Sequence, residues 1–124
     1  MDNLHITPTI KTPAISFNAA GTFSLSGKSI PENSIEFYKS VYEWLDQYAQ
    51  MPAAETIITI QLEYFNTSSS KCLLDIFRKL EAIYNSGKSK VQIKWMYEEE
   101  DEDMMEAGDD YRTLIKLPFD IQKI

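Results

Sequence analysis

The sequence predicts an α/β fold, a single domain over residues 1–124 in which a small mixed β-sheet is packed with helices. Three observations support this prediction. Residues 57–65 are rich in β-branched and aromatic side chains and alternate after Ile58, which is typical of a strand buried mainly on one face. Apolar residues then recur at three- and four-residue steps over 72–84, as on one face of a helix. Residues 91–97 alternate again, so strand, helix and strand predict a right-handed crossover between parallel strands.

Short strands are expected before this unit. Residues 4–13 include two prolines and fit an extended segment that pairs along a sheet edge. Two strand candidates follow at 14–17 and 22–26, and the four residues between them end in Gly21, a spacing typical of a β-hairpin. A loop is expected over 27–32.

The first helix is expected to begin at Asn33, because Glu36 stands three residues later, at the spacing of a capping box. Pro52 follows near its end. Its buried stripe consists of Phe37, Tyr38, Val41, Trp44, Leu45 and Tyr48. Tyr42 lies at the edge of this stripe and is a candidate contact for a partner.

The second helix is expected to end in a left-handed glycine cap within residues 85–88, Asn-Ser-Gly-Lys. After the last predicted strand, residues 111–117 fit either a strand or a short helix that Pro118 stops. Phe119 and Ile121 are expected to pack the tail back on the core.

An uninterrupted acidic run occupies residues 98–103. The first interpretation of such a run is a solvated surface. The alternatives are an acidic edge that steers a basic partner and, for an enzyme, a divalent-metal site. A helix-loop-helix calcium loop needs a glycine at its sixth position, and that glycine is absent.

Composition narrows the classes of partner. The formal net charge is −7 and the pI is about 4.6, so the chain repels phosphate backbones and anionic membranes, and nucleic acid is not expected as a partner. The N-terminus has no basic region followed by an apolar core, and no apolar run approaches membrane-spanning length. We therefore expect a cytoplasmic protein without membrane insertion.

The residues that catalysis requires are scarce. His5 is the only histidine and lies near the N-terminus, so neither a metal site nor a base for a serine or cysteine nucleophile is expected. Cys72, the only cysteine, falls in an apolar stripe and is expected to be buried, a reactive thiol being the alternative. The four glycines are scattered and form no phosphate cradle. A protein that acts by binding, with no cofactor, is favoured over an enzyme.

The junction at residues 66–71, Asn-Thr-Ser-Ser-Ser-Lys, is the candidate functional segment. Its hydroxyl and amide side chains stand where a helix leaves backbone N–H groups unsatisfied and where its dipole is positive. A helix cap is the first interpretation, but one cap uses one side chain. A hydroxyl at a helix start is also a position where an added phosphate is electrostatically tolerated.

Three segments resemble the SiaC family of bacterial regulatory phosphoproteins, and the resemblance spans nearly the whole chain. They are Pro31-Glu32-Asn33-Ser34 before the first helix, Leu62-Glu63-Tyr64-Phe65-Asn66-Thr67-Ser68-Ser69 at the junction, and the acidic run that ends in Glu106-Ala107-Gly108-Asp109. The resemblance implies a fold similar to STAS-type anti-sigma-factor antagonists.

The resemblance also implies a non-enzymatic partner switch. The unphosphorylated protein binds and activates a diguanylate cyclase in c-di-GMP signalling, a Ser/Thr kinase releases it by phosphorylation, and a PP2C-type phosphatase restores it. The phosphorylated threonine of the family motif falls on Thr67, and Ser68 and Ser69 are the alternatives. The predicted partner-binding residues are Tyr42, Asn66, Thr67, Ser68, Ser69, Lys71 and Arg78. The alternative function is an anti-sigma-factor antagonist that uses the same phosphorylation chemistry on an anti-sigma kinase.

Overall fold

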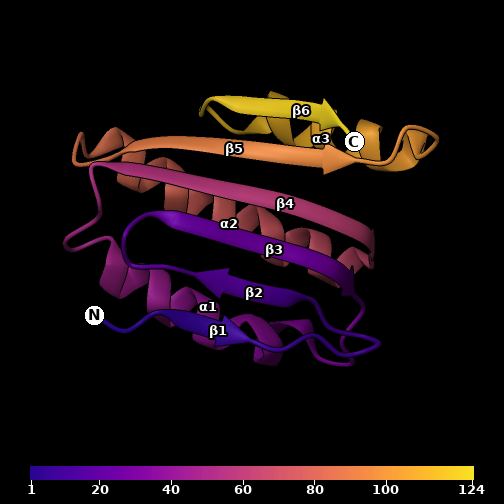
Figure 1. Ribbon diagram of the computed structural model, residues 1–124, viewed down its shortest axis with the longest axis horizontal. Coiled ribbons are helices and arrows are strands. Elements are labelled where there is room, and N and C mark those ends of the chain that lie inside the picture. Colours follow the sequence, from indigo (N-terminus) through magenta and orange to yellow (C-terminus); the bar gives the residue numbers. More distant parts are fainter.

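Six strands form one mixed β-sheet in chain order, β1 to β6, and three helices lie against one of its faces (Figure 1). The computed structural model describes residues 1–124. The strands are β1 (Leu4–Ile6), β2 (Ala14–Phe17), β3 (Thr22–Ser29), β4 (Glu55–Phe65), β5 (Lys90–Tyr97) and β6 (Phe119–Lys123). The helices are α1 (Ser34–Tyr48), α2 (Thr67–Asn85) and α3 (Glu102–Leu114). The predicted α/β class is confirmed.

The N-terminal strands are antiparallel. The lead-in pairs at the sheet edge as predicted, since β1 runs along β2, and β2 and β3 form the predicted hairpin. The loop predicted over 27–32 is wrong at its start, because β3 continues to Ser29. Gly27, at φ +104°, adopts a backbone conformation that favours glycine, and the β3–β4 register shifts between Gly27 and Lys28, so the strand keeps pairing past this irregularity.

The remaining pairs, β3 with β4, β4 with β5, and β5 with β6, are parallel, and one helix connects each pair. Ile58, Ile60 and Leu62 are buried beneath the helices, while Thr59 and Gln61 alternate with them on the uncovered face. Because the strands are parallel, the helix starts that follow β3, β4 and β5 gather along one edge of the sheet. The candidate segment at the start of α2 lies on that edge.

The C-terminal third departs most from the sequence prediction. Residues 111–114 are the last turn of α3 and not a separate strand or short helix, since α3 begins at Glu102 inside the acidic run. Asp101 caps this helix, its carboxylate accepting from the Met104 N–H at 3.0 Å. The tail packs on the core as expected, but it does so as a strand, β6, which the sequence prediction missed.

Two aromatic groups fill the ends of the core between sheet and helices. At one end Phe17 stacks on Phe23 with ring centroids 4.5 Å apart, and Tyr48 packs on Phe23. At the other end Trp95 is fully buried and donates its indole N–H to the Met104 carbonyl at 2.9 Å. Cys72 is buried, as predicted, and none of the helices is both long and apolar enough to span a bilayer.

Replacement of Gly108 by alanine is expected to destabilise the protein. A Cβ there would lie 2.6 Å from Trp95 Cδ1 and 2.8 Å from Trp95 Nε1, too close for a ring that has no free space to retreat into. Overpacking of this kind costs about 1–3 kcal/mol, against about 1 kcal/mol gained from the helix propensity of alanine. Both contacts are shorter than those that Cβ atoms make in proteins, so the cost belongs to the upper part of this range, about 2–3 kcal/mol. Urea unfolding of Gly108→Ala should therefore show a net loss of about 1–2 kcal/mol, and an unchanged midpoint would contradict this packing.

Candidate functional site

The side chain of Asn66 caps α2. Its amide oxygen accepts from the Ser69 N–H at 2.9 Å and from the Ser68 hydroxyl at 3.1 Å. The capping side chain is therefore an amide. The sequence prediction had left open whether an amide or a hydroxyl would form the cap. All four hydroxyl residues that follow, Thr67 to Ser70, lie inside the first helical turn and need another explanation.

The four hydroxyls differ in access. Thr67 is the first helical residue, its side chain is exposed, and its hydroxyl takes part in no intramolecular hydrogen bond. Ser68 is exposed but its hydroxyl is engaged with the cap and with Ser34, at 2.7 Å. Ser70 is half-buried and donates to the Thr67 carbonyl at 2.7 Å. Thr67 is thus the exposed hydroxyl of this turn that no other side chain holds.

Ser69 has the opposite environment, because its side chain is 0% exposed. Its hydroxyl donates to the Ser29 carbonyl at 2.9 Å and accepts from the Ser29 hydroxyl at 2.8 Å. The structure therefore disfavours Ser69 both as an alternative phosphorylation site and as a direct partner contact. The sequence prediction did not separate Ser69 from Thr67 and Ser68, because the packing of α2 on β3 determines which of the four hydroxyls is buried.

Ser69 belongs to a chain of hydroxyls that joins α1, α2 and β3 and is buried except at Ser68. The members are Ser34, Ser68, Ser69, Ser29 and Tyr38. Because the Ser29 proton goes to Ser69, the Tyr38 hydroxyl must donate to Ser29, 2.6 Å away. Burial raises the pKa of Tyr38 to about 12, with the Ser29 hydrogen bond lowering it in part, so this donor stays protonated at neutral pH.

A groove of about 610 Å³ lies between α1 and α2, and we call it the α1–α2 groove. It is lined by Ile35, Tyr42, Thr67, Ser68, Lys71, Cys72 and Asp75. Four predicted site residues, Tyr42, Thr67, Ser68 and Lys71, are therefore brought together. Ile35, which is 76% exposed, was missed. The sequence indicated Ile35 only as an apolar residue that follows the start of the first helix and lies outside its predicted buried stripe.

Tyr42 forms one wall of this groove. Its hydroxyl donates to the Cys72 carbonyl at 3.2 Å, and burial raises its pKa, so the bond between α1 and α2 persists at neutral pH. The Lys79 ammonium lies 5.7 Å from the ring centroid and pairs with Asp46 at 2.7 Å. Tyr42 is half-buried and leaves part of its ring open to the groove.

Arg78 is not brought into the groove. It lies eleven residues after Thr67, about 16 Å along the helix axis. Its guanidinium donates to Glu81 and to the Leu114 carbonyl, both at 3.3 Å, and so joins α2 to the end of α3. The Lys116 N–H, together with Arg78, lowers the pKa of Glu81. Arg78 is therefore engaged within the protein, and its predicted partner contact remains a prediction.

The side chains of the acidic run are not gathered into a metal site, since no group of three or more His, Cys, Asp or Glu side chains is placed to hold a metal ion.

The start of α2 is an environment that favours anions. The Ser34–Ser68 hydrogen bond brings the first turns of α1 and α2 into contact, so the positive ends of two helix dipoles lie close together. Lys71, one turn from Thr67, adds a cation that forms no ion pair.

Comparison with known proteins gives a family. The sequence model of the SiaC family regulatory phosphoproteins matches residues 6–124. An uncharacterised protein of Pseudomonas aeruginosa (strain UCBPP-PA14) is 35% identical over 123 residues, which cover 98% of this chain and 97% of that protein. The solved structure of SiaC of P. aeruginosa matches over 100% of both chains, with a TM-score of 0.90 and 34% identity.

A second solved structure contains a partner. One chain in the crystal structure of the diguanylate cyclase SiaD in complex with its activator SiaC, from P. aeruginosa, is 34% identical to this chain with a TM-score of 0.90. The match covers 98% of this chain and 99% of that one.

Removal of the Ser69 hydroxyl is expected to destabilise the fold, whereas removal of the Ser70 hydroxyl is not. Ser69→Ala leaves the buried Ser29 hydroxyl without its acceptor, a cost of about 1–3 kcal/mol. Ser70→Ala loses only a bond within its own turn and should stay within about 0.5 kcal/mol of the parent. Urea unfolding of both variants measures the difference, and equal midpoints would show that the hydroxyl chain does not hold α2 to β3.

Proposed function

Because the chain belongs to the SiaC family of regulatory phosphoproteins, we propose that it is a non-enzymatic partner-switch regulator that binds and activates a diguanylate cyclase in its unphosphorylated form. SiaC is the activator of the cyclase SiaD in the solved complex from P. aeruginosa, and this chain matches one chain of that complex along nearly its full length. The observation that supports a switch at this site is the free, exposed hydroxyl of Thr67 at the first position of α2.

In this proposal a Ser/Thr kinase phosphorylates Thr67 and a PP2C-type phosphatase removes the phosphate. Access favours Thr67 over its neighbours, since the Ser68 hydroxyl is held by Asn66 and Ser34 and that of Ser69 is sealed inside the fold. A kinase must hold the hydroxyl of its substrate in one geometry relative to the nucleotide. A hydroxyl that first has to break two hydrogen bonds is a poorer acceptor of the phosphoryl group. Ser68 remains the second choice.

Phosphorylation adds about −1.5 to −2 charges and three acceptor oxygens. In the free protein these are favourably placed, because the first turn of α2 offers backbone N–H groups and Lys71 is one turn away. In the complex the same group has to be desolvated against the partner. The phosphate therefore favours the free state over the bound one.

The size of the effect decides between two mechanisms. Moving a binding equilibrium from almost fully bound to almost fully free takes about 5.5 kcal/mol. Loss of a helix cap changes stability by only about 1 kcal/mol, and here the cap is Asn66, which phosphorylation leaves in place. A buried, poorly paired phosphate is large enough, so we propose exclusion of the partner and not unfolding of the helix start.

Thr67→Ala is expected to bind the cyclase like the parent, whereas Thr67→Asp and Thr67→Glu are expected to bind at least about tenfold more weakly, equivalent to about 1.4 kcal/mol. An acidic side chain at the first position of a helix stabilises it, so weak binding by these variants cannot be assigned to misfolding. Calorimetric titration of the purified cyclase measures each affinity.

Ser40→Asp is the matched control, because it adds the same charge at an exposed position of α1 outside the α1–α2 groove. Parent-like binding by both acidic Thr67 variants would refute exclusion at this site. Capture of an anti-sigma kinase in place of the cyclase would favour the antagonist function with the same switch.

A further inference from the structure

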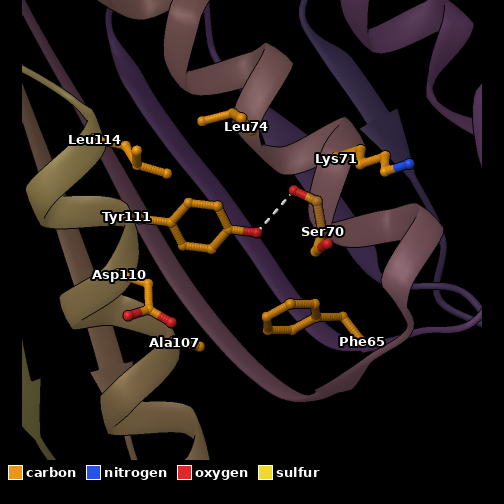
Figure 2. A pocket seen from close by; sticks show the side chains of 8 residues that line it. All are labelled: Phe65, Ser70, Lys71, Leu74, Ala107, Asp110, Tyr111 and Leu114. Atoms are coloured by element: carbon orange, nitrogen blue, oxygen red, sulfur yellow. Dashed lines mark hydrogen bonds between the residues drawn. The ribbon is translucent and has the colours of Figure 1, made fainter.

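The outer edge of β6 has no strand beside it. β6 ends the sheet in the order β1 to β6, and no element lies beyond it in Figure 1. α3 contacts β6 but is held towards α2, because the Tyr111 hydroxyl donates to the Ser70 carbonyl at 2.8 Å (Figure 2). Arg78 on α2 also donates to the Leu114 carbonyl at 3.3 Å. The backbone groups on the outer side of β6 are therefore open to another chain.

Alternate residues of β6 direct their backbone groups outwards. The Ile93 N–H donates to the Pro118 carbonyl, and the Ile124 N–H donates to the Tyr97 carbonyl, both at 2.9 Å. Residues of a strand bond to a given neighbour at steps of two, so the even-numbered residues of this segment bond to β5. The odd-numbered residues direct their N–H and C=O groups away from β5, and these are Phe119, Ile121 and Lys123.

The opposite edge of the sheet is protected against pairing. β1 has three residues, and Pro8 and Pro13 follow it before β2 begins. Short strands and prolines at an edge hinder pairing with other chains. β6 has five residues and contains neither proline nor glycine, so its edge keeps the ability to pair.

The side chains of β6 complement a second copy of the same strand. Two β6 strands that run antiparallel about a two-fold axis at Ile121 place Asp120 of one copy opposite Gln122 of the other. A glutamine amide donates to a carboxylate, and within one chain Gln122 already donates to Asp120. On the helix side of the sheet, Ile121 meets its own copy and Phe119 meets Lys123. Like charges therefore do not face each other.

The same register also pairs the backbone. The outward groups of Phe119, Ile121 and Lys123 meet the outward groups of the same three residues in reverse order. A register centred on Asp120 would set two aspartates opposite each other, which is unfavourable. A register centred on Gln122 would set the Asp120 carboxylate opposite Ile124, whose side chain has no donor.

We infer that two copies of this chain associate through β6 and form one continuous sheet. The two-fold axis uses the same edge of both copies, so the interface closes on itself and recruits no third copy. The inference does not rest on the proposed function, because Thr67 follows β4, which β5 separates from β6. The dimer leaves Thr67 uncovered in both copies and so presents two candidate sites to partners.

Concentration and salt should both affect this dimer. One pair of strands buries a small area, so the affinity is modest and the dimer fraction rises with protein concentration. Each copy has a net charge of −7, and salt screens the repulsion between the copies. Sedimentation equilibrium of the full chain should therefore show more dimer when salt is added at low ionic strength. A dimer that salt dissociates would indicate an ion-paired surface and overturn the inference.

A charge exchange tests the register by sedimentation equilibrium. Gln122→Asp sets an aspartate opposite Asp120 at two places in the interface, so the dimer should be at least about tenfold weaker. Gln122→Asp combined with Asp120→Lys restores opposite charges in this register and not in its two neighbours, and should recover the dimer. The matched control, Gln61→Asp, adds the same charge on the same face at an exposed position of β4. It should stay within about twofold of the parent.

Lys123→Pro tests the backbone pairing. The Lys123 N–H faces away from β5, and an edge strand tolerates proline at such a position, so the variant should fold. It lacks the N–H that bonds to Phe119 of the second copy, and its dimer should be at least about tenfold weaker. Lys123→Ala loses the same side chain and its ion pair with Glu99 but keeps the N–H, and should stay within about threefold of the parent. Thermal unfolding reports whether each variant is folded.

Four other results would overturn the inference. A parent that stays monomeric throughout the concentration series rejects association through β6. A dimer that either Gln122→Asp or Lys123→Pro leaves intact assigns association to another surface. Failure of the combined variant to recover the dimer rejects the register. A monomeric parent whose cyclase binding is lost in Lys123→Pro and kept in Lys123→Ala assigns this edge to a strand of the cyclase. The Thr67 variants test the proposed function separately.

Discussion

Ser69 fixes the first turn of α2 against the sheet. Its hydroxyl both donates to the Ser29 carbonyl and accepts from the Ser29 hydroxyl, at the end of β3 and with no exposure to solvent. The Asn66 N–H donates to the same carbonyl at 3.0 Å, so the cap and the first turn share one anchor. In a low-dielectric interior such bonds are strong, and breaking one leaves a buried hydroxyl unsatisfied. The directions of the Thr67 and Ser68 side chains follow from this contact, because they share the first turn of α2 with Ser69.

Once Ser69 faces inward, helix geometry determines its neighbours. Successive residues of a helix are rotated by about 100°, so Thr67 and Ser68 cannot share its environment. Ser68 turns to Ser34 on α1, and Thr67 is left facing solvent beside the α1–α2 groove. Four similar side chains in sequence thus yield one anchor, one contact between helices, one free hydroxyl and, at Ser70, one hydrogen bond within the turn. The anchor is separate from Thr67, the residue that we propose is phosphorylated, so a charge there leaves the packing of α2 intact.

The sequence predicts the interior of this fold well and its ends less well. The strand at 57–65 and the buried stripes of α1 and α2 are repetitive, and the capping spacing from Asn33 to Glu36 recurs in the structure, with the Glu36 N–H bonded to Asn33 at 3.2 Å. β6 escaped prediction because a five-residue edge strand with two charged side chains has little pattern of its own. It is a strand because β5 offers an unpaired edge, which is a property of the assembled sheet.

The sequence indicated the part of the candidate site that lies on one segment, residues 66–71. The motif at residues 66–71 predicted Thr67 as the phosphorylated residue, and this assignment stays a prediction. Which of the hydroxyls is buried depends on Ser29, which is distant in sequence and gave no local signal. Tyr42 and Lys71 were identified by exposure, and the fold brings them to one groove because α1 and α2 lie side by side. Arg78 satisfied the same criterion of charge and position but is used to join α2 to α3. Exposure alone does not distinguish a free cation from one that already has a partner.

A switch needs a modification whose free energy differs between two states, because a change that affects both states equally shifts nothing. A negative charge at the first position of α2 stabilises the free helix by about 0.3–1 kcal/mol through the dipole, so phosphorylation does not oppose folding. In the proposed complex the same charge would lie beneath the partner and lose its hydration, with only Lys71 and the helix end as compensation. A helix N-terminus therefore lowers the free energy of the phosphate, whereas burial at an interface raises it. Thr67 combines both in the proposed switch, since its exposed hydroxyl stands at the first position of α2.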